Sequence, residues 1–220
     1  MGIGTYLMYR DGEEEYDTLR EYVDVEEPKE NADSEDTEEN QEETVTVDFE
    51  ALKKINREII AWIRIPDTGI DYPVVQGADN EYYLKHTFKK TEHVAGSIFL
   101  DKDNSPDFSN RKSILYGHNM KDGSMFQGLH KYENEQYLEI HNKVYLYLPD
   151  GQTLIYSVIK CGYVSANSDT FWLGEPVETR QLLLSTCGSD SSKRLVLFCE
   201  LPEESEESET NGEGISMEVF

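Results

Sequence analysis

Six segments between residues 71 and 201 have the composition of β-strands, and they limit what this chain can fold into. Each is short, rich in β-branched and aromatic residues, and bounded by Gly, Pro, Asn or Asp. Many short strands with few intervening helices favour a mainly β fold, a closed or nearly closed barrel, over a doubly wound sheet. The segments are DYPVVQ (71–76), GSIFLD (96–101), RKSILYGHN (111–119), KVYLYLPDGQTLIYSVIKCGYV (143–164), RQLLLSTC (180–187) and RLVLFCEL (194–201).

Two further stretches predict helices, and one predicts a turn. Residues 48–65, DFEALKKINREIIAWIRI, carry apolar residues at helical spacing, so we expect a helix with one face packed on the main body. Asp48 suits the capping position at its start. Residues 123–141 predict a short helix between two strands, and Asp-Gly within 148–152 predicts a tight hairpin turn. The apolar positions of the first helix are Phe49, Leu52, Ile55, Ile59 and Trp62.

The formal charge of −25 at pH 7 is concentrated at the two ends of the chain. Residues 1–44 carry 17 Asp and Glu against 3 Lys and Arg, and residues 203–220 carry 7 against none, which leaves −4 for residues 45–202. Such ends cannot bury enough apolar surface to offset chain entropy. We therefore expect acidic disordered ends around a folded domain (45–202): a linker in residues 1–44 and a tail in residues 203–220. The short apolar start of residues 1–44 is interpreted separately, as a membrane-proximal stub. Nucleic-acid binding is not expected, because no basic stripe is present to neutralise phosphates.

The three cysteines do not have the spacing of a metal site or a disulfide framework. Cys161, Cys187 and Cys199 are odd in number and form no CxxC pair. Cys161 and Cys199 lie in apolar, strand-like runs, as small buried residues do, and a disulfide between them remains open. The sequence also contains no Gly-rich phosphate loop, HExxH or GxSxG motif, so we expect neither a metal nor a cofactor.

One histidine and one cysteine stand at the ends of predicted strands. With a two-residue period, His118 shares a face with Tyr116, and Cys187 shares a face with Ser185. We expect the other four histidines, which lie in polar or loop-like surroundings, at the surface. These are His86, His93, His130 and His141.

Arg194 begins the last strand-like segment, seven residues after Cys187. If segments 180–187 and 194–201 pair as a hairpin, Arg194 lies opposite or nearly opposite Cys187. An arginine there favours the thiolate and offers donors to a developing oxyanion. A histidine from another strand end would complete the parts of an activated cysteine nucleophile.

Several blocks of this sequence, in the same order, resemble class B sortases. LLSTC at 183–187 is similar to the TLxTC signature of the sortase family, with Arg194 at the usual distance downstream and His118 far upstream. DYPVVQGADNEYYLKHTF, GSIFLD and SILYGHNMKDGSMFQGLHKY resemble the corresponding blocks of the class B members. The resemblance covers residues 50–201, nearly all of the segment expected to fold.

The resemblance implies a fold, an activity and a set of site residues. The fold is a closed sortase-type β-barrel of about eight strands with an N-terminal helix and short connecting helices. The activity is cysteine transpeptidation: Cys187 attacks the threonine carbonyl of an LPxTG or NPxTN-like sorting signal, His118 transfers protons, and Arg194 holds carbonyls or the oxyanion. By analogy the substrate-binding residues are Asn80, Leu84, Tyr116, Ser185 and Thr186.

The resemblance also implies partners and a location. The first substrate is the sorting-signal peptide of a secreted surface protein, and the acceptor is an amine of a peptidoglycan precursor or a pilin. Such enzymes are membrane-anchored at the extracellular face of the cell membrane. The apolar start of this chain covers about nine residues, too few to span a bilayer, so we expect an incomplete anchor and a soluble chain.

Besides the missing full-length transmembrane helix, two departures from the family and two alternatives accompany this interpretation. Leu183 stands where the signature has threonine, and about sixteen residues join segments 143–164 and 180–187 where class B sortases usually carry a longer insertion that helps to choose the signal. A cysteine peptidase that hydrolyses the same kind of signal shares the chemistry up to the thioester. A non-catalytic β-barrel binding module would carry the thiol incidentally.

Overall fold

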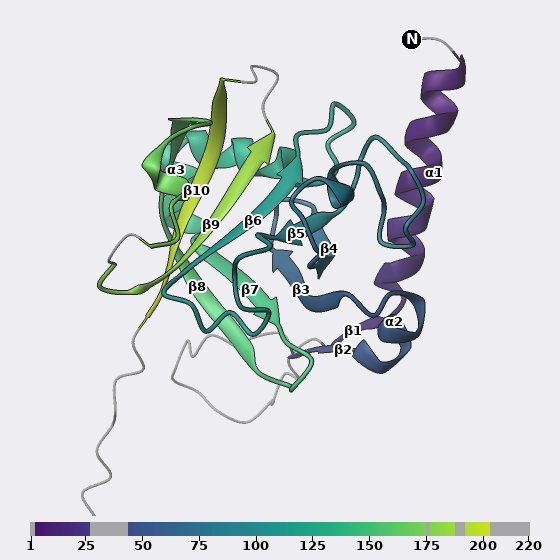
Figure 1. The fold of residues 1–220 in the computed structure, drawn as a ribbon, viewed down its shortest axis with the longest axis horizontal. Coiled ribbons are helices and arrows are strands. Elements are labelled where there is room, and N and C mark those ends of the chain that lie inside the picture. The colour runs from purple at the N-terminus through teal and green to yellow at the C-terminus, as the bar shows by residue number, and fades with distance from the viewer. Residues whose placement is uncertain (1–2, 27–43, 175–176, 188–191, 203–220) are drawn as a thin grey trace, which may run out of the picture.

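The computed structural model describes residues 3–26, 44–174, 177–187 and 192–202; for residues 3–11 and Cys187 it describes the backbone alone. Eight strands form a closed barrel in the order β10–β8–β7–β3–β4–β5–β6–β9 (Figure 1). The predicted mainly β fold with a barrel of about eight strands is confirmed. The barrel strands are β3 (Ile59–Ile65), β4 (Ile70–Val75), β5 (Ile98–Leu100), β6 (Lys112–His118), β7 (Lys143–Tyr147), β8 (Thr153–Ser165), β9 (Arg180–Cys187) and β10 (Lys193–Leu201).

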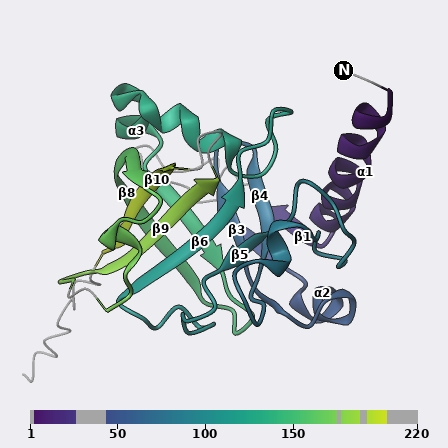
Figure 2. The same cartoon turned by 45° about the horizontal axis from the view of Figure 1, so that its top comes forward.

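The directions of the strands decide which chain segments meet at each end of the barrel. The predicted hairpin β7–β8 forms around the turn at 148–152, and β9 pairs antiparallel with β10. The pairs β4–β5 and β6–β9 are parallel. As a result, β6 and β9 run side by side and end at the same rim of the barrel (Figure 2).

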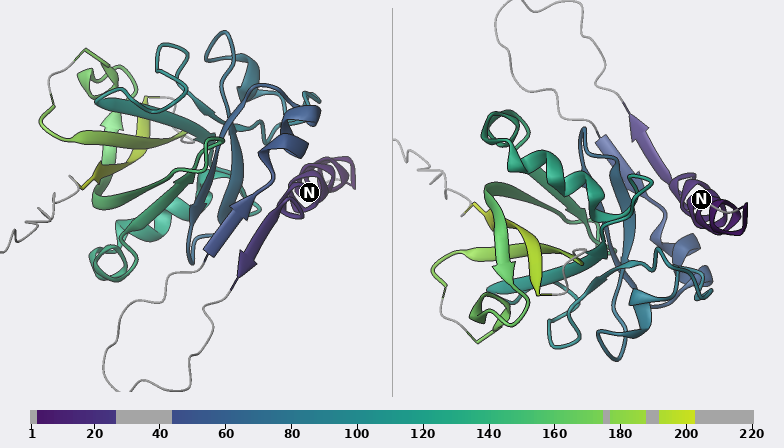
Figure 3. Two further views of the ribbon diagram at one scale, coloured as in Figure 1. Left: turned by 90° about the horizontal axis from the view of Figure 1, so that it is seen from below. Right: turned by 90° about the horizontal axis from the view of Figure 1, so that it is seen from above.

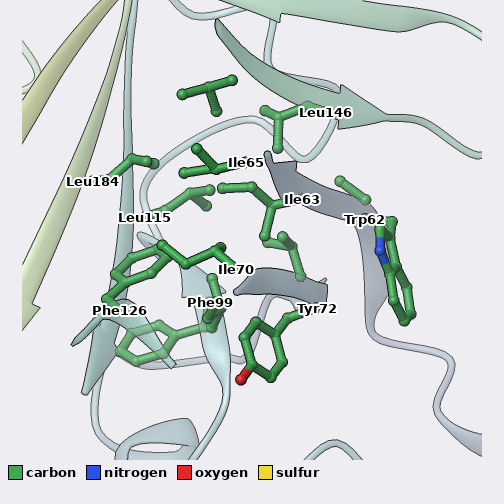
Figure 4. Close-up of a cluster of buried hydrophobic side chains, with 14 of the residues drawn as sticks. Trp62, Ile63, Ile65, Ile70, Tyr72, Phe99, Leu115, Phe126, Leu146 and Leu184 are labelled. Carbon is green, nitrogen blue, oxygen red and sulfur yellow. The ribbon is translucent and has the colours of Figure 1, made fainter. Parts of the chain in front are cut away.

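The barrel interior is filled by aliphatic and aromatic side chains from every side. Ile63 and Ile65 of β3 meet Leu115 of β6 and Leu184 of β9 there, and all four are at most 2% exposed (Figure 4). Trp62 lies on the opposite face of β3, where its indole N–H donates to the Asp71 carboxylate at 2.6 Å. This alternation is the two-residue period of a β-strand.

The helix predicted over 48–65 is shorter than expected. Asp48 caps α2 (Phe49–Ile55) as predicted, with its carboxylate accepting from the Ala51 N–H at 2.9 Å. The prediction that Ile59 and Trp62 continue this helix is wrong, because both belong to β3. Asn56 ends the helix in an extended conformation, and its buried side-chain amide donates to the Tyr83 hydroxyl and the Phe88 carbonyl.

The N-terminal segment also needs a correction. Residues 3–26 are not a disordered stub: they form α1 (Ile3–Arg20) and β1 (Val23–Glu26), and β1 pairs with β2 (Thr44–Val47) beside the barrel (Figure 3). Leu19 of α1 is fully buried and Tyr16 is 4% exposed, because both pack against the barrel side. The acidic centre of the predicted linker, 27–43, and the tail 203–220 lie outside the described residues.

The remaining helices are short connections. The helix predicted within 123–141 is present as a 3₁₀ segment, η2 (Phe126–Glu133), followed by α3 (Glu135–Ile140). Two single turns, η1 (Tyr82–Leu84) and η3 (Asp169–Phe171), lie in the β4–β5 and β8–β9 connections. In the part of the chain that the structure describes, no helix has the length and apolar character needed to cross a membrane.

Candidate active site

His118 and Cys187 are direct neighbours in the barrel wall. Residues of β6 and β9 pair in parallel from Lys112 with Gln181 up to His118 with Cys187, the last residues of their strands. Because adjacent strands lie about 4.8 Å apart, the two Cα atoms are separated by roughly that distance. The topology therefore joins a histidine and a cysteine that are far apart in the sequence.

Both positions belong to the outer face of the barrel. Two and four residues before them, Tyr116 and Ile114 of β6 share a face with His118, and Leu183 of β9 shares a face with Cys187. Ile114 and Leu183 form a buried cluster with Val196 that is separate from the main core. The β8–β9 connection covers this cluster with Phe171 and Leu173.

Arg194, the third predicted catalytic residue, belongs to β10, the strand that pairs with β9. The last described pair of β9 and β10 before their connecting loop is Ser185 with Val196. The ladder ends there, two residues short of Cys187 on β9 and of Arg194 on β10, so the predicted pairing of these two residues lies just beyond it. Arg194 is half-buried, and its Nη1 donates to the Lys193 carbonyl at 3.0 Å. The loop 188–191 lies outside the described residues.

The imidazole of His118 is held by a backbone carbonyl. Its Nε2 lies 2.7 Å from the carbonyl oxygen of Leu84, at the end of η1. A carbonyl only accepts, so Nε2 carries the hydrogen of this bond and Nδ1 is the ring nitrogen left for other proton exchange. Leu84 thus contacts the candidate histidine through its main chain.

The buried turn at Gly96 packs against the Leu84 carbonyl. Gly96 packs so closely that a Cβ on it would lie 2.8 Å from the Leu84 oxygen. The Gly96 carbonyl in turn accepts from the Tyr16 hydroxyl of α1 at 2.6 Å. The N-terminal helix is therefore connected to the candidate histidine through three successive contacts.

Four of the five predicted substrate-binding residues, Asn80, Leu84, Tyr116 and Ser185, lie around this site. Tyr116 donates its hydroxyl to the Asp101 carboxylate at 2.9 Å, and Asn80 donates its side-chain amide to the same oxygen at 2.9 Å. Asn80 precedes η1, so it does not share a helical face with Leu84.

Ser185 and Thr186 are placed on opposite faces of β9. Ser185 shares the outer face with Leu183, whereas Thr186 shares the inner face with Leu184. The two side chains are 0% and 1% exposed, and among the described residues neither hydroxyl has a hydrogen-bond partner. The Thr186 side chain therefore does not belong to the face that carries the His118 and Cys187 positions.

The other two cysteines are not suited to act as nucleophiles. Burial, together with the nearby charge of Glu133, raises the pKa of Cys161 to about 12. Burial also raises the pKa of Cys199 well above the usual thiol range. Both thiols are free, so the disulfide that the sequence left open is not formed. Cys199 pairs with Val158 across β8, not with Cys161.

Two features of the surroundings were not expected. His93, predicted at the surface, is 8% exposed: its ring packs against Gly12 of α1, and its Nδ1 accepts from the Ala95 N–H at 3.1 Å. A pocket of about 410 Å³ lies beside α1, between Tyr16, Tyr72 and the loop at 122–124. None of the predicted site residues lines it.

Comparison with known proteins decides the family. The family model for the sortase domain matches residues 63–202. The chain belongs to the sortase family. Sortase B of Listeria monocytogenes is 49% identical over 90 residues, which are 41% of this chain and 37% of that protein. Sortase B of Staphylococcus aureus is 40% identical over 100 residues, 46% of this chain and 41% of that protein, so each match spans about two fifths of the relative's length.

Solved structures of class B sortases share the fold. Sortase B from B. anthracis in complex with AAEK1 has a TM-score of 0.68 at 28% identity and covers 90% of this chain and 100% of that one. The Staphylococcus aureus sortase B–substrate complex has a TM-score of 0.61 at 28% identity. The match covers 71% of this chain and 85% of that one. A sortase B complexed with triglycine has a TM-score of 0.64 at 27% identity. The match covers 71% of this chain and 86% of that one. The resemblance to class B sortases expected from the sequence is confirmed.

Proposed function

We propose that this sortase is a cysteine transpeptidase that cleaves an LPxTG or NPxTN-like sorting signal after threonine. The observation that carries the proposal is the register of β6 and β9, which pairs His118 with Cys187 at one rim of the barrel. Membership of the sortase family supports the assignment of this pair to acyl transfer. The proposed location is the extracellular face of the cell membrane.

The first half of the reaction forms a thioester. The Cys187 thiolate attacks the threonine carbonyl carbon, and Arg194 stabilises the oxyanion that develops as the C–S bond forms. The C–N bond then breaks, and the departing amine takes a proton from the His118 imidazolium. Because the Nε2–H of His118 is hydrogen-bonded to the Leu84 carbonyl, Nδ1 is the ring nitrogen through which His118 exchanges this proton.

The second half transfers the acyl group to an amine. The acceptor nitrogen attacks the thioester carbon and loses a proton to His118, and the C–S bond breaks to release the thiolate. One amide is broken and one is formed, so the atoms balance without a further reactant. The proposed acceptor is an amine of a peptidoglycan precursor or a pilin, and the sortase B complex with triglycine supports this tripeptide as the first acceptor to use in an assay.

The proposed peptide-binding residues are Asn80, Leu84, Tyr116 and Ser185 around the outer face. Thr186 also belongs to the proposed set, but its inward side chain restricts it to contacts through the main chain.

The test is a cleavage assay on LPxTG and NPxTN peptides with and without triglycine, using Cys187→Ala as the blank. We expect cleavage by the wild type only, with an amide adduct to triglycine when the amine is present. Hydrolysis without any adduct would support a cysteine peptidase instead. Equal peptide cleavage by the wild type and by Cys187→Ala would support the non-catalytic binding module.

A further inference from the structure

We propose that Asp101 is a positioning residue for the sorting signal: it fixes the orientation of the Asn80 amide and of the Tyr116 hydroxyl, and thereby sets which hydrogens and lone pairs they present to the peptide. Asp101 directly follows β5 and is 7% exposed. The inference rests on the proposed function, because it takes Asn80 and Tyr116 as residues that contact the peptide.

Both residues converge on one oxygen of Asp101. The Tyr116 hydroxyl and the Asn80 Nδ2 each donate to Asp101 Oδ2 at 2.9 Å. The other oxygen, Oδ1, accepts from the Asp103 N–H at 3.0 Å. A carboxylate only accepts, so it can satisfy three donors that arrive from three different parts of the chain.

These bonds set the polarity of the two groups. The Asn80 Oδ1 accepts from the Lys102 N–H at 2.8 Å, so the orientation of the amide is fixed at both ends. Toward a peptide, Asn80 can then offer its second N–H as a donor, and its oxygen keeps one lone pair as an acceptor. Tyr116 has placed its hydrogen on Asp101, so its phenolic oxygen can act toward a peptide only as an acceptor.

The main chain of Asp101 is itself fixed by two hydrogen bonds. Its N–H donates to the Ile114 carbonyl of β6 at 2.9 Å, and its carbonyl accepts from the Gln76 side chain at 2.9 Å. A buried acceptor fixed in this way orients its partners before a substrate arrives, which lowers the entropy cost of binding. The expected consequence is an effect on peptide binding and not on the reactivity of the thiol.

The decisive variant is Asp101→Asn, which keeps the shape of the side chain. Its amide nitrogen must face either the Asn80 and Tyr116 donors or the Asp103 N–H, so at least one bond is replaced by a donor–donor contact. We expect KM for the sorting-signal peptide to rise by about tenfold or more, the size expected when charge-assisted hydrogen bonds are lost. We expect kcat to stay within about threefold, and alkylation of Cys187 by iodoacetamide to keep its rate.

Asp103→Asn is the matched control on the same loop. Its carboxylate is exposed and bonds the Lys102 ammonium at 2.8 Å, so KM and kcat should remain at wild-type values. Tyr116→Phe tests the same bond from the other side and keeps the ring against Phe99. If Asp101 acts through Tyr116, the two substitutions together should raise KM by less than the product of their separate effects.

Several results would overturn the proposal. An unchanged KM in Asp101→Asn would do so, as would equal losses in kcat and in the alkylation rate, which would indicate a structural role. If Asp101→Asn does not fold, a Tyr116→Phe variant with wild-type KM overturns the proposal in the same way, and a raised KM supports it. A wild type that cleaves no sorting-signal peptide would instead refute the proposed function, and the positioning role of Asp101 with it.

Discussion

Replacing Gly96 by alanine should misplace the imidazole of His118 through a backbone carbonyl. Gly96 has a φ of +55°, in the left-handed region, where a side chain costs on the order of 1 kcal/mol. The new Cβ would lie 2.5 Å from the Tyr83 oxygen and 2.8 Å from the Leu84 oxygen, whereas ordinary contact begins at 3.4 Å. The Leu84 oxygen, which bonds His118 Nε2 at 2.7 Å, must therefore move by about half an ångström or more.

We expect this shift to lower kcat/KM for peptide cleavage by about 10- to 100-fold, because small displacements of a reacting group have effects of this size. Strain and contact together should lower the free energy of unfolding by about 2 kcal/mol, which corresponds to roughly 4–8 °C in Tm for a chain of this length. The measurements are steady-state cleavage of the sorting-signal peptide and thermal unfolding followed by circular dichroism.

Gly69→Ala is the matched control. Gly69 has a φ of +78°, and a Cβ on it would have no atom within 4 Å, so the backbone strain is similar and the contact is absent. It should lose about 1 kcal/mol of stability and keep its activity. A folded Gly96→Ala variant with normal kcat/KM, or an equal loss of activity in Gly69→Ala, would refute the link between this turn and His118.

Three further outcomes are expected. Arg194→Lys keeps the charge but loses the planar fork, so turnover should fall by about two orders of magnitude in a protein with unchanged Tm; near-normal turnover would remove this residue from the site. Deleting 203–220 should leave Tm and turnover unchanged, whereas deleting 1–26 should lower Tm by about 5 °C or more, because it removes the fully buried Leu19; equal Tm values in both deletions would contradict this. Cys161 is only half-buried, but burial raises its pKa to about 12, so it stays protonated from neutral pH up to about pH 11. Mass mapping after iodoacetamide treatment at pH 8 should therefore find it unmodified; rapid labelling would show that its pKa is not raised in this way.

The barrel was predictable because its strands carry local signals. The segments around Tyr116, Ser185 and Arg194 are short, apolar and bounded by turn residues, and each became a strand. The prediction from hydrophobic spacing failed where a helix is followed closely by a strand. Ile59 and Trp62 match helical spacing from Phe49, but Asn56 ends the helix through hydrogen bonds to residues far along the chain. Tertiary contacts of this kind leave no local signal in the sequence.

The strand ends that carry the candidate residues were predictable, but the contacts that hold these residues in place were not. Strand alternation places Cys187 on the face of Ser185 and Thr186 on the opposite face of the same strand. The role of Leu84 could not be read from its side chain, because its backbone carbonyl makes the contact with His118. The burial of α1 was missed because the acidic composition of residues 1–44 obscured Tyr16 and Leu19.

Intact-protein mass spectrometry of the enzyme during turnover tests the central claim most directly. With a sorting-signal peptide and no amine, the wild type should gain the mass of the fragment that ends in threonine, mapped to Cys187. Triglycine should then remove this mass and release the fragment as an amide. An adduct mapped to Cys161 or Cys199, or one that persists in Cys187→Ala, would contradict the account.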